Sequence, residues 1–111
     1  MAVLSNISID QGADYSAEII VEDANGNVAN LANYTVAGQI RKSYASSTAT
    51  NFSVVISNAG NGMITATLSS TTTNLMKAGR YVYDIEVTDS AGKKTRVVEG
   101  QVTINPGVTQ I

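Results

Sequence analysis

Four charged residues in the last third of the chain are the side chains best suited to acid–base chemistry. Asp84 and Glu86 alternate along one predicted strand, and Arg96 and Glu99 lie on the next. Side chains two apart on a strand share a face, so the carboxylates of Asp84 and Glu86 lie together, and paired carboxylates are the catalytic groups of glycoside hydrolases. Opposite charges on neighbouring strands also form ordinary surface pairs. We favour this second interpretation, a solvated group of cross-strand ion pairs.

A second motif has the spacing with which a calcium-binding loop begins: Asp23, Asn25 and Asn27. The glycine, however, is at position 26, and Tyr34 occupies the place of the bidentate glutamate. The dipeptide at 25–26 suits the positive φ angles of a tight hairpin turn. We therefore expect a turn here and no metal site.

The tyrosines are the residues that would bind a sugar, because an exposed aromatic ring has an apolar face and a polar hydroxyl. Four of the five fall on inward faces of predicted strands and are expected to pack in the core: Tyr15, Tyr34, Tyr81 and Tyr83. Tyr44 lies in a polar loop. It is the candidate glycan contact of this sequence.

The composition argues against several classes of chemistry. The chain has no cysteine and no histidine, so it offers no thiolate nucleophile, no imidazole base and no soft metal site. Only seven Lys and Arg are spread over 111 residues, which leaves no basic stripe for nucleic acid. No run is long and apolar enough to cross a membrane, and the start lacks the features of a signal peptide. We expect no enzymatic activity, no cofactor, and no nucleic-acid or membrane partner.

Alternation of apolar and polar residues dominates the chain and is broken by short Asn, Gly, Asp and Ser clusters. That pattern is typical of short strands joined by turns. It predicts seven strands, near residues 3–9, 15–22, 34–42, 52–57, 63–68, 81–87 and 94–104. A helical turn is expected within 69–76, capped by Ser70 or Thr71, with Leu75 closing the end of the fold. Gly38, on an inward face, would leave room for a neighbouring ring.

The corner before the sixth predicted strand indicates the fold class. Gly79 ends a non-strand segment, and Tyr81 follows at the start of an alternating strand. In immunoglobulin-like sandwiches a tyrosine at this place bonds its hydroxyl to nearby backbone. The rest of that signature is missing, because Tyr83 stands where the cysteine would be and the chain has no tryptophan. We predict an all-β fold: residues 1–111 form one seven-stranded antiparallel immunoglobulin-like β-sandwich without a disulfide.

Several segments resemble a class of small phage virion proteins. They are Ile40-Arg41-Lys42, Ile64-Thr65-Ala66-Thr67-Leu68-Ser69, Gly79-Arg80-Tyr81-Val82-Tyr83-Asp84-Ile85-Glu86 and Val98-Glu99-Gly100-Gln101-Val102-Thr103-Ile104. Members of this class are immunoglobulin-like sandwiches similar to the N-terminal domain of baseplate upper proteins and to small capsid decoration proteins. The resemblance implies a structural part of a phage particle. In the baseplate family the domain precedes receptor-binding parts, whereas this chain ends after the domain, which favours a small accessory subunit.

Four apolar residues on predicted outward faces would allow such a subunit to dock: Ile20, Val55, Val82 and Val97. Single exposed apolar residues are ordinary, but a cluster marks a contact patch. We therefore expect a virion subunit on the particle surface, made in the host cytoplasm, that binds neighbouring shell proteins as a capsid decoration or cement protein. Its partners would be major capsid or tail proteins, or further copies of itself. Two alternatives stay open, a tail, baseplate or fibre accessory subunit and a carbohydrate-binding or adhesion module.

Overall fold

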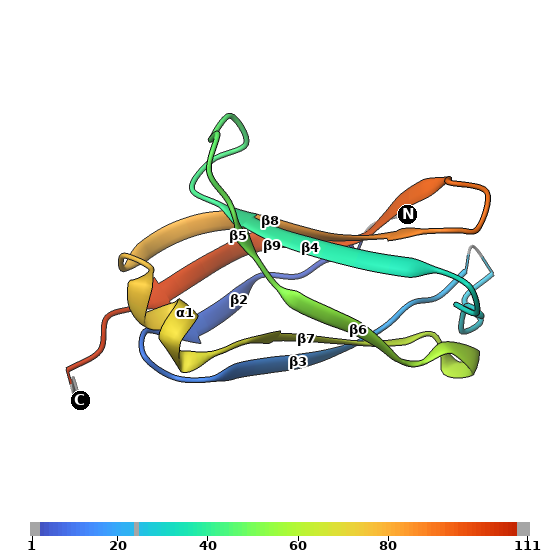
Figure 1. Cartoon of the computed structure of the whole chain (residues 1–111), viewed down its shortest axis with the longest axis horizontal. Helices are drawn as coiled ribbons and strands as arrows, with labels where there is room; N and C mark the ends of the chain where they lie inside the picture. Colours follow the sequence, from blue (N-terminus) through green and yellow to red (C-terminus); the bar gives the residue numbers. More distant parts are fainter. Residues whose placement is uncertain (1–2, 24, 109–111) are drawn as a thin grey trace.

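The computed structural model describes residues 3–23 and 25–108. Within these ranges nine strands form two sheets that pack face to face as a β-sandwich (Figure 1). The strands are β1 (Val3–Leu4), β2 (Ile7–Asp10), β3 (Tyr15–Ile20), β4 (Thr35–Arg41), β5 (Thr50–Asn51), β6 (Ser53–Asn58), β7 (Met63–Leu68), β8 (Gly79–Thr88) and β9 (Lys94–Asn105). The helices are the 3-10 helix η1 (Ala59–Asn61) and the α-helix α1 (Ser70–Leu75). Neither has the length and apolar character that a membrane crossing requires.

The two sheets differ in size and in strand direction. Sheet A has the order β5-β4-β8-β9, with β1 and β2 both along the outer edge of β9, and sheet B has the order β3-β7-β6. All pairs are antiparallel except that β1 and β2 run parallel to β9. The expectation of an entirely antiparallel sandwich is therefore wrong at this edge. A hairpin forces its two strands to be antiparallel, but these edge partners are the first and last strands, which no hairpin joins.

Each of the seven predicted segments contains a strand, and two local features raise the count to nine. The first segment breaks at Ser5 and Asn6 into β1 and β2. The segment from Thr50 to Asn58 crosses from one sheet to the other, since β5 pairs with β4 and β6 pairs with β7. Phe52 stands at the crossing, where its amide donates to the carbonyl of Gly38 at 2.9 Å.

One apolar core fills the space between the sheets. Phe52 packs edge-on against Tyr83, with ring centroids 6.0 Å apart. A β-carbon at Gly38 would lie 3.2 Å from Phe52 and 2.9 Å from Ile85, so the predicted room for a neighbouring ring is confirmed. Burying a branched aliphatic or aromatic side chain contributes about 1.5–3 kcal/mol. The largest fully buried apolar side chains are Ile9, Leu31, Ile40, Ile64, Ile85, Val102 and Ile104.

The corner before β8 has the predicted tyrosine bond. The hydroxyl of Tyr81 donates to the carbonyl of Lys77 at 2.7 Å. Gly79 has a φ of 141°, which an L side chain rarely adopts. The ammonium of Lys42 lies 4.7 Å from the centre of the Tyr81 ring, within the range of a cation–π contact. Together these contacts set where β8 begins.

The end of the sandwich near α1 is closed by Thr73 and Met76, not by Leu75. The helix begins after Ser69, whose hydroxyl accepts from the amide of Thr72 at 3.3 Å, so the cap lies one residue before the earliest predicted position. Thr73 is fully buried and Met76 is 7% exposed, whereas Leu75 is 81% exposed. Thr73 points inward from the helix and Met76 is buried as the extended residue that follows it, whereas Leu75 points to solvent.

Candidate functional site

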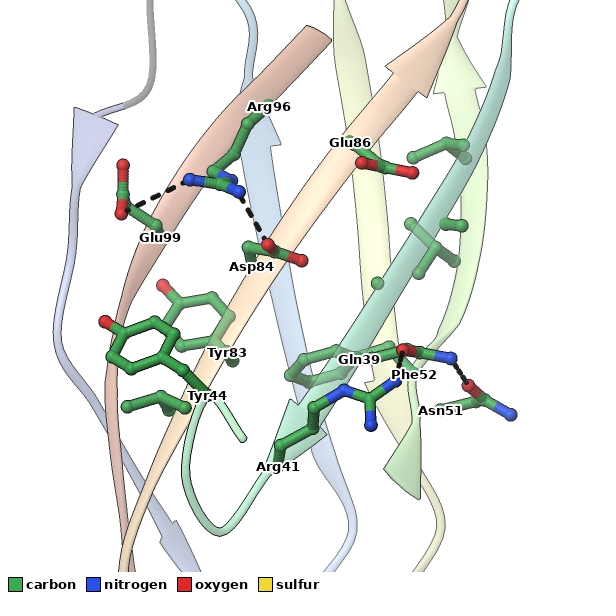
Figure 2. Close-up of a pocket in the computed structure, with 15 residues that line it drawn as sticks. Gln39, Arg41, Tyr44, Asn51, Phe52, Tyr83, Asp84, Glu86, Arg96 and Glu99 are labelled. Atoms are coloured by element: carbon green, nitrogen blue, oxygen red, sulfur yellow. Dashed lines mark hydrogen bonds and ion pairs between the residues drawn. The ribbon is translucent and has the colours of Figure 1, made fainter. Parts of the chain in front are cut away.

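A shallow hollow of about 670 Å³ lies over the outer face of sheet A (Figure 2). Its floor consists of side chains from β4, β8 and β9 that alternate with the core-facing ones. Tyr44, from the loop between β4 and β5, stands at its side. The hollow continues past the edge of β4 towards Phe52 and Val54. It is open to solvent and is lined by both polar and apolar side chains.

Three of the four charged residues singled out in the sequence form ion pairs in this hollow. The Nε atom of Arg96 lies 3.1 Å from Oδ2 of Asp84, and its Nη1 atom lies 3.8 Å from Oε1 of Glu99. The predicted cross-strand ion pair is confirmed for Asp84 on β8 and Arg96 on β9, whereas the pair of Arg96 with Glu99 lies within β9. Glu86 is the register partner of Arg96, but the guanidinium turns towards Asp84. All three paired side chains are more than a third exposed, so the pairs contribute little to stability.

A row of hydrogen bonds links the floor of the hollow to the loop that carries Tyr44. Gln39 Nε2 donates to Oδ1 of Asn51 at 2.9 Å. Arg41 Nη2 donates to Oε1 of Gln39 at 3.0 Å, and Arg41 Nη1 donates to the backbone carbonyl of Ser46 at 2.7 Å. The bond to Ser46 ties the loop to β4 two residues beyond Tyr44. The position of the loop is thus set by a side chain of the sheet.

The tyrosines divide as the sequence predicted. Tyr83 is buried, and Tyr15, Tyr34 and Tyr81 are partly buried against the core. Burial raises the pKa of Tyr83 and of Tyr15 above the usual value of about 10. Tyr44 is 84% exposed, so its ring is available to a ligand.

Two of the four predicted docking residues lie on one surface. Ile20 and Val55 are each 56% exposed on the outer face of sheet B. Met63, which is not among the predicted docking residues, lies directly opposite Ile20 in the register of β3 and β7. Val55 pairs with Thr65, two residues along the same face from Met63. We call Ile20, Met63 and Val55 the sheet B patch.

The other two predicted docking residues lie elsewhere. Val82 faces outward from β8, but on sheet A, where it is half-buried in the floor of the hollow. The expectation that Val97 faces outward is wrong, because it is 8% exposed. The register of β8 and β9 shifts there: Ile85 pairs with Val98, but Glu86 pairs with Arg96. Val97 is the extra residue of this β-bulge, which interrupts the strict alternation.

Comparison with known proteins gives a fold likeness only. No protein-family model matches the sequence, and no curated protein matches it. The chain is similar in fold to the N-terminal domain of ORF48 from phage TP901-1. The TM-score is 0.56 at 15% identity, over 91% of this chain and 85% of that chain. CopC from Methylosinus trichosporium OB3b aligns with a TM-score of 0.49 at 14% identity, over 94% and 89% of the two chains.

The ORF48 domain belongs to a phage protein, so it agrees at the level of the fold with the resemblance noted in the sequence segments. At 15% identity a shared fold says nothing about the hollow or the sheet B patch. What either surface binds has to be argued from its own residues.

Proposed function

We propose that this protein is a non-enzymatic structural subunit on the surface of a phage particle, where it docks on neighbouring shell proteins as a capsid decoration or cement protein. The observation that carries the proposal is the sheet B patch, an exposed apolar cluster on an otherwise polar sheet face. The resemblance of the sequence segments to phage virion proteins supports the choice of partner.

We also propose the immunoglobulin-like form of the β-sandwich for this fold. In such domains the second, fourth and fifth strands of the seven pair in one sheet, and the third, sixth and seventh pair in the other. Sheet B, with the order β3-β7-β6, and the row β4-β8-β9 of sheet A follow this arrangement. The bond from Tyr81 to Lys77 supports the same assignment.

The sheet B patch has an apolar centre and polar neighbours, as a small docking surface does. Ile20 and Met63 face each other across β3 and β7, and Val55 reaches the same area from β6. Diagonal neighbours on one sheet face lie about 7–8 Å apart, so the three side chains form a continuous apolar area. Glu18 and Thr65 lie beside it on the same face. An apolar centre with a polar rim is typical of protein interfaces.

The size of this face favours an assembly with many contacts over a stable isolated pair. Three strands of six residues make a face of roughly 300 Å², from spacings of about 3.4 Å along and 4.8 Å between strands. A stable pairwise interface buries about 800 Å² on each partner. One such contact would be weak, whereas a symmetric shell combines many through avidity. This is the working principle of a decoration subunit.

The experiment measures binding to source particles that lack the subunit. An Ile20→Lys, Val55→Lys double variant is expected to lose about tenfold or more in affinity, because it places two charges in the apolar centre. The matched control is Ser16→Lys, Ser53→Lys, which adds the same charges on the same face but at the Thr67 end of the sheet, and should bind nearly as wild type. Equal loss in both variants, or absence of the protein from purified particles, would contradict the proposal.

Copy number in cryo-microscopy of the particle separates the decoration role from the tail alternative. Hundreds of copies indicate a shell position, whereas about six to eighteen copies indicate a sixfold tail or baseplate.

A further inference from the structure

We propose that the hollow on the outer face of sheet A is a carbohydrate-binding site, with the ring of Tyr44 as its stacking platform. This binding activity goes beyond the structural role proposed above and does not rest on it. The hollow and the sheet B patch lie on the outer faces of different sheets. A subunit docked through sheet B would therefore present the hollow away from the particle.

The first support is the exposure of Tyr44 on a tethered loop. The ring is 84% exposed. Covering an aromatic side chain of this size would remove about 150–250 Å² of mostly apolar surface from water, so a ligand that packs on the ring would gain that burial. The loop is held to β4 by the bond from Arg41 to the Ser46 carbonyl, and a turn closes where the amide of Ser46 donates to the carbonyl of Ser43 at 3.1 Å. An exposed ring on an anchored backbone is arranged for a ligand, since ordering a free loop would reduce affinity.

The second support is the set of planar polar groups that line the same hollow as the ring. Figure 2 shows Tyr44 at one side of the hollow, with Asp84 and Glu99 on β8 and β9 and with Gln39 and Asn51 across the floor. Among residues 3–23 and 25–108, Arg96 forms its ion pairs with Oδ2 of Asp84 and Oε1 of Glu99. The second oxygen of each carboxylate can accept further hydrogen bonds. The hollow thus combines an aromatic face with several side chains of fixed hydrogen-bonding geometry.

The charge and polarity of the lining favour a sugar over other ligands. The lining contains three carboxylates and two guanidinium groups, from Asp84, Glu86, Glu99, Arg41 and Arg96. Arg96 is paired with two of these carboxylates, Arg41 bonds to neutral oxygens of Gln39 and Ser46, and the five charged side chains together carry a net negative charge. Phosphate groups and nucleic acid, which require free positive charge, are therefore poorly matched to this surface.

An apolar peptide is less well matched, because charged and amide side chains lie among the apolar lining residues, which are Val36, Ala37, Phe52, Val54 and Val82. Each hydroxyl group of a pyranose can both donate and accept a hydrogen bond. It can therefore donate to a carboxylate and either donate to or accept from a side-chain amide. The C–H face of the same ring can cover the aromatic side chain. The volume of about 670 Å³ is in the range of small-molecule sites, which is enough for an oligosaccharide segment.

The test titrates the isotope-labelled protein with cellohexaose, maltohexaose, chitohexaose and mannohexaose and follows the amide and ring resonances by NMR. We expect at least one of these oligosaccharides to shift resonances of Tyr44, Val82 and Gln39 with a Kd on the order of 1 mM or lower. Tyr44→Ala should weaken that binding about tenfold or more, and Tyr44→Phe, which keeps the aromatic face, should remain within about threefold.

Two controls separate binding from folding and from docking. Because Tyr44 is exposed, Tyr44→Ala should keep the wild-type Tm, and it should bind particles as wild type does. Ile20→Ala, on the other sheet, should bind the oligosaccharide as wild type. If none of the four oligosaccharides shifts these resonances at about 10 mM, or if Tyr44→Ala binds equally well, the proposal is wrong. Shifts of the same resonances by inorganic phosphate or by an oligothymidylate would also overturn the assignment to carbohydrate.

Discussion

The hydroxyl of Tyr83 donates a hydrogen bond of 2.6 Å to the backbone carbonyl of Ser5, which lies 78 residues earlier in the chain. The bond joins β8 to the break between β1 and β2. It passes beside Gly100 on β9, where a β-carbon would overlap the Ser5 carbonyl oxygen. Next to it, the side chain of Asn6 accepts from the amide of Gln101 at 3.0 Å. The N-terminal segment is thus held to the sheet by these two contacts in addition to its strand pairing.

Replacing Gly100 by alanine should destabilise the fold by displacing Ser5. The expected loss is about 1–3 kcal/mol in the free energy of unfolding, measured by urea denaturation. Gly60→Ala is the matched control, because a β-carbon there meets only the side-chain oxygen of Asn58 at 3.9 Å. Similar losses in the two variants would show that the close approach at Gly100 is unimportant.

Removing the Tyr83 hydroxyl should also destabilise the protein while keeping the packing of its ring. In Tyr83→Phe the Ser5 carbonyl loses its partner in a partly buried place, and such a loss costs about 1–2 kcal/mol. Tyr44→Phe removes the same atom from an exposed ring and should leave the free energy of unfolding unchanged. A Tyr83→Phe variant as stable as wild type would mean that water replaces the bond without cost.

Thr73 should be the most sensitive polar position near α1. Its hydroxyl donates to the carbonyl of Ala13 at 2.9 Å and accepts from the amide of Gly12 at 3.0 Å, and the side chain is fully buried. Thr73→Val keeps the shape but leaves both backbone groups without this partner, for an expected loss of about 2–3 kcal/mol in thermal or urea unfolding. Thr71→Val, exposed on the same helix, should change stability by less than about 0.5 kcal/mol. Equal effects would contradict this role for Thr73.

Stability should fall at alkaline pH. Burial raises the pKa of Tyr83 and Tyr15 above about 10, so at higher pH the folded state keeps protons that the unfolded state has released. The contribution of these groups is complete below pH 10 and is lost as pH rises through the folded pKa. Urea unfolding at several pH values from 7 to 11.5 measures the slope.

The double variant Tyr83→Phe, Tyr15→Phe should flatten that slope above pH 10, whereas Tyr44→Phe should keep it. If the free energy of unfolding stays constant above pH 10, or if it already begins to decrease at a pH lower than 9, these two hydroxyls do not cause the pH dependence.

Much of the site was predictable where the pattern is local. Alternation along β8 predicted that Tyr83 faces the core and Asp84 the solvent, and the structure confirms both. Val97 was mispredicted because the bulge that buries it depends on how β8 and β9 pair, which alternation in one strand does not report. Leu75 was expected to close the end of the fold, but Thr73 and Met76 do so, because packing on the rest of the fold decides which side of this short helix is buried.

The amino-acid sequence is enough to predict the all-β class, the positions of most strands, the tyrosine bond at the corner and the exposure of Tyr44. These depend on short-range features, namely period-two alternation, turn residues and loop polarity. That Ile20, Met63 and Val55 share a face follows from the folded arrangement, because strand pairing between distant segments places them there. In the same way the folded arrangement decides that Tyr44, Gln39 and Asp84 border one hollow and that Gly100 admits Ser5. Such contacts join residues far apart in the chain, so register and sheet order, which local patterns do not encode, determine them.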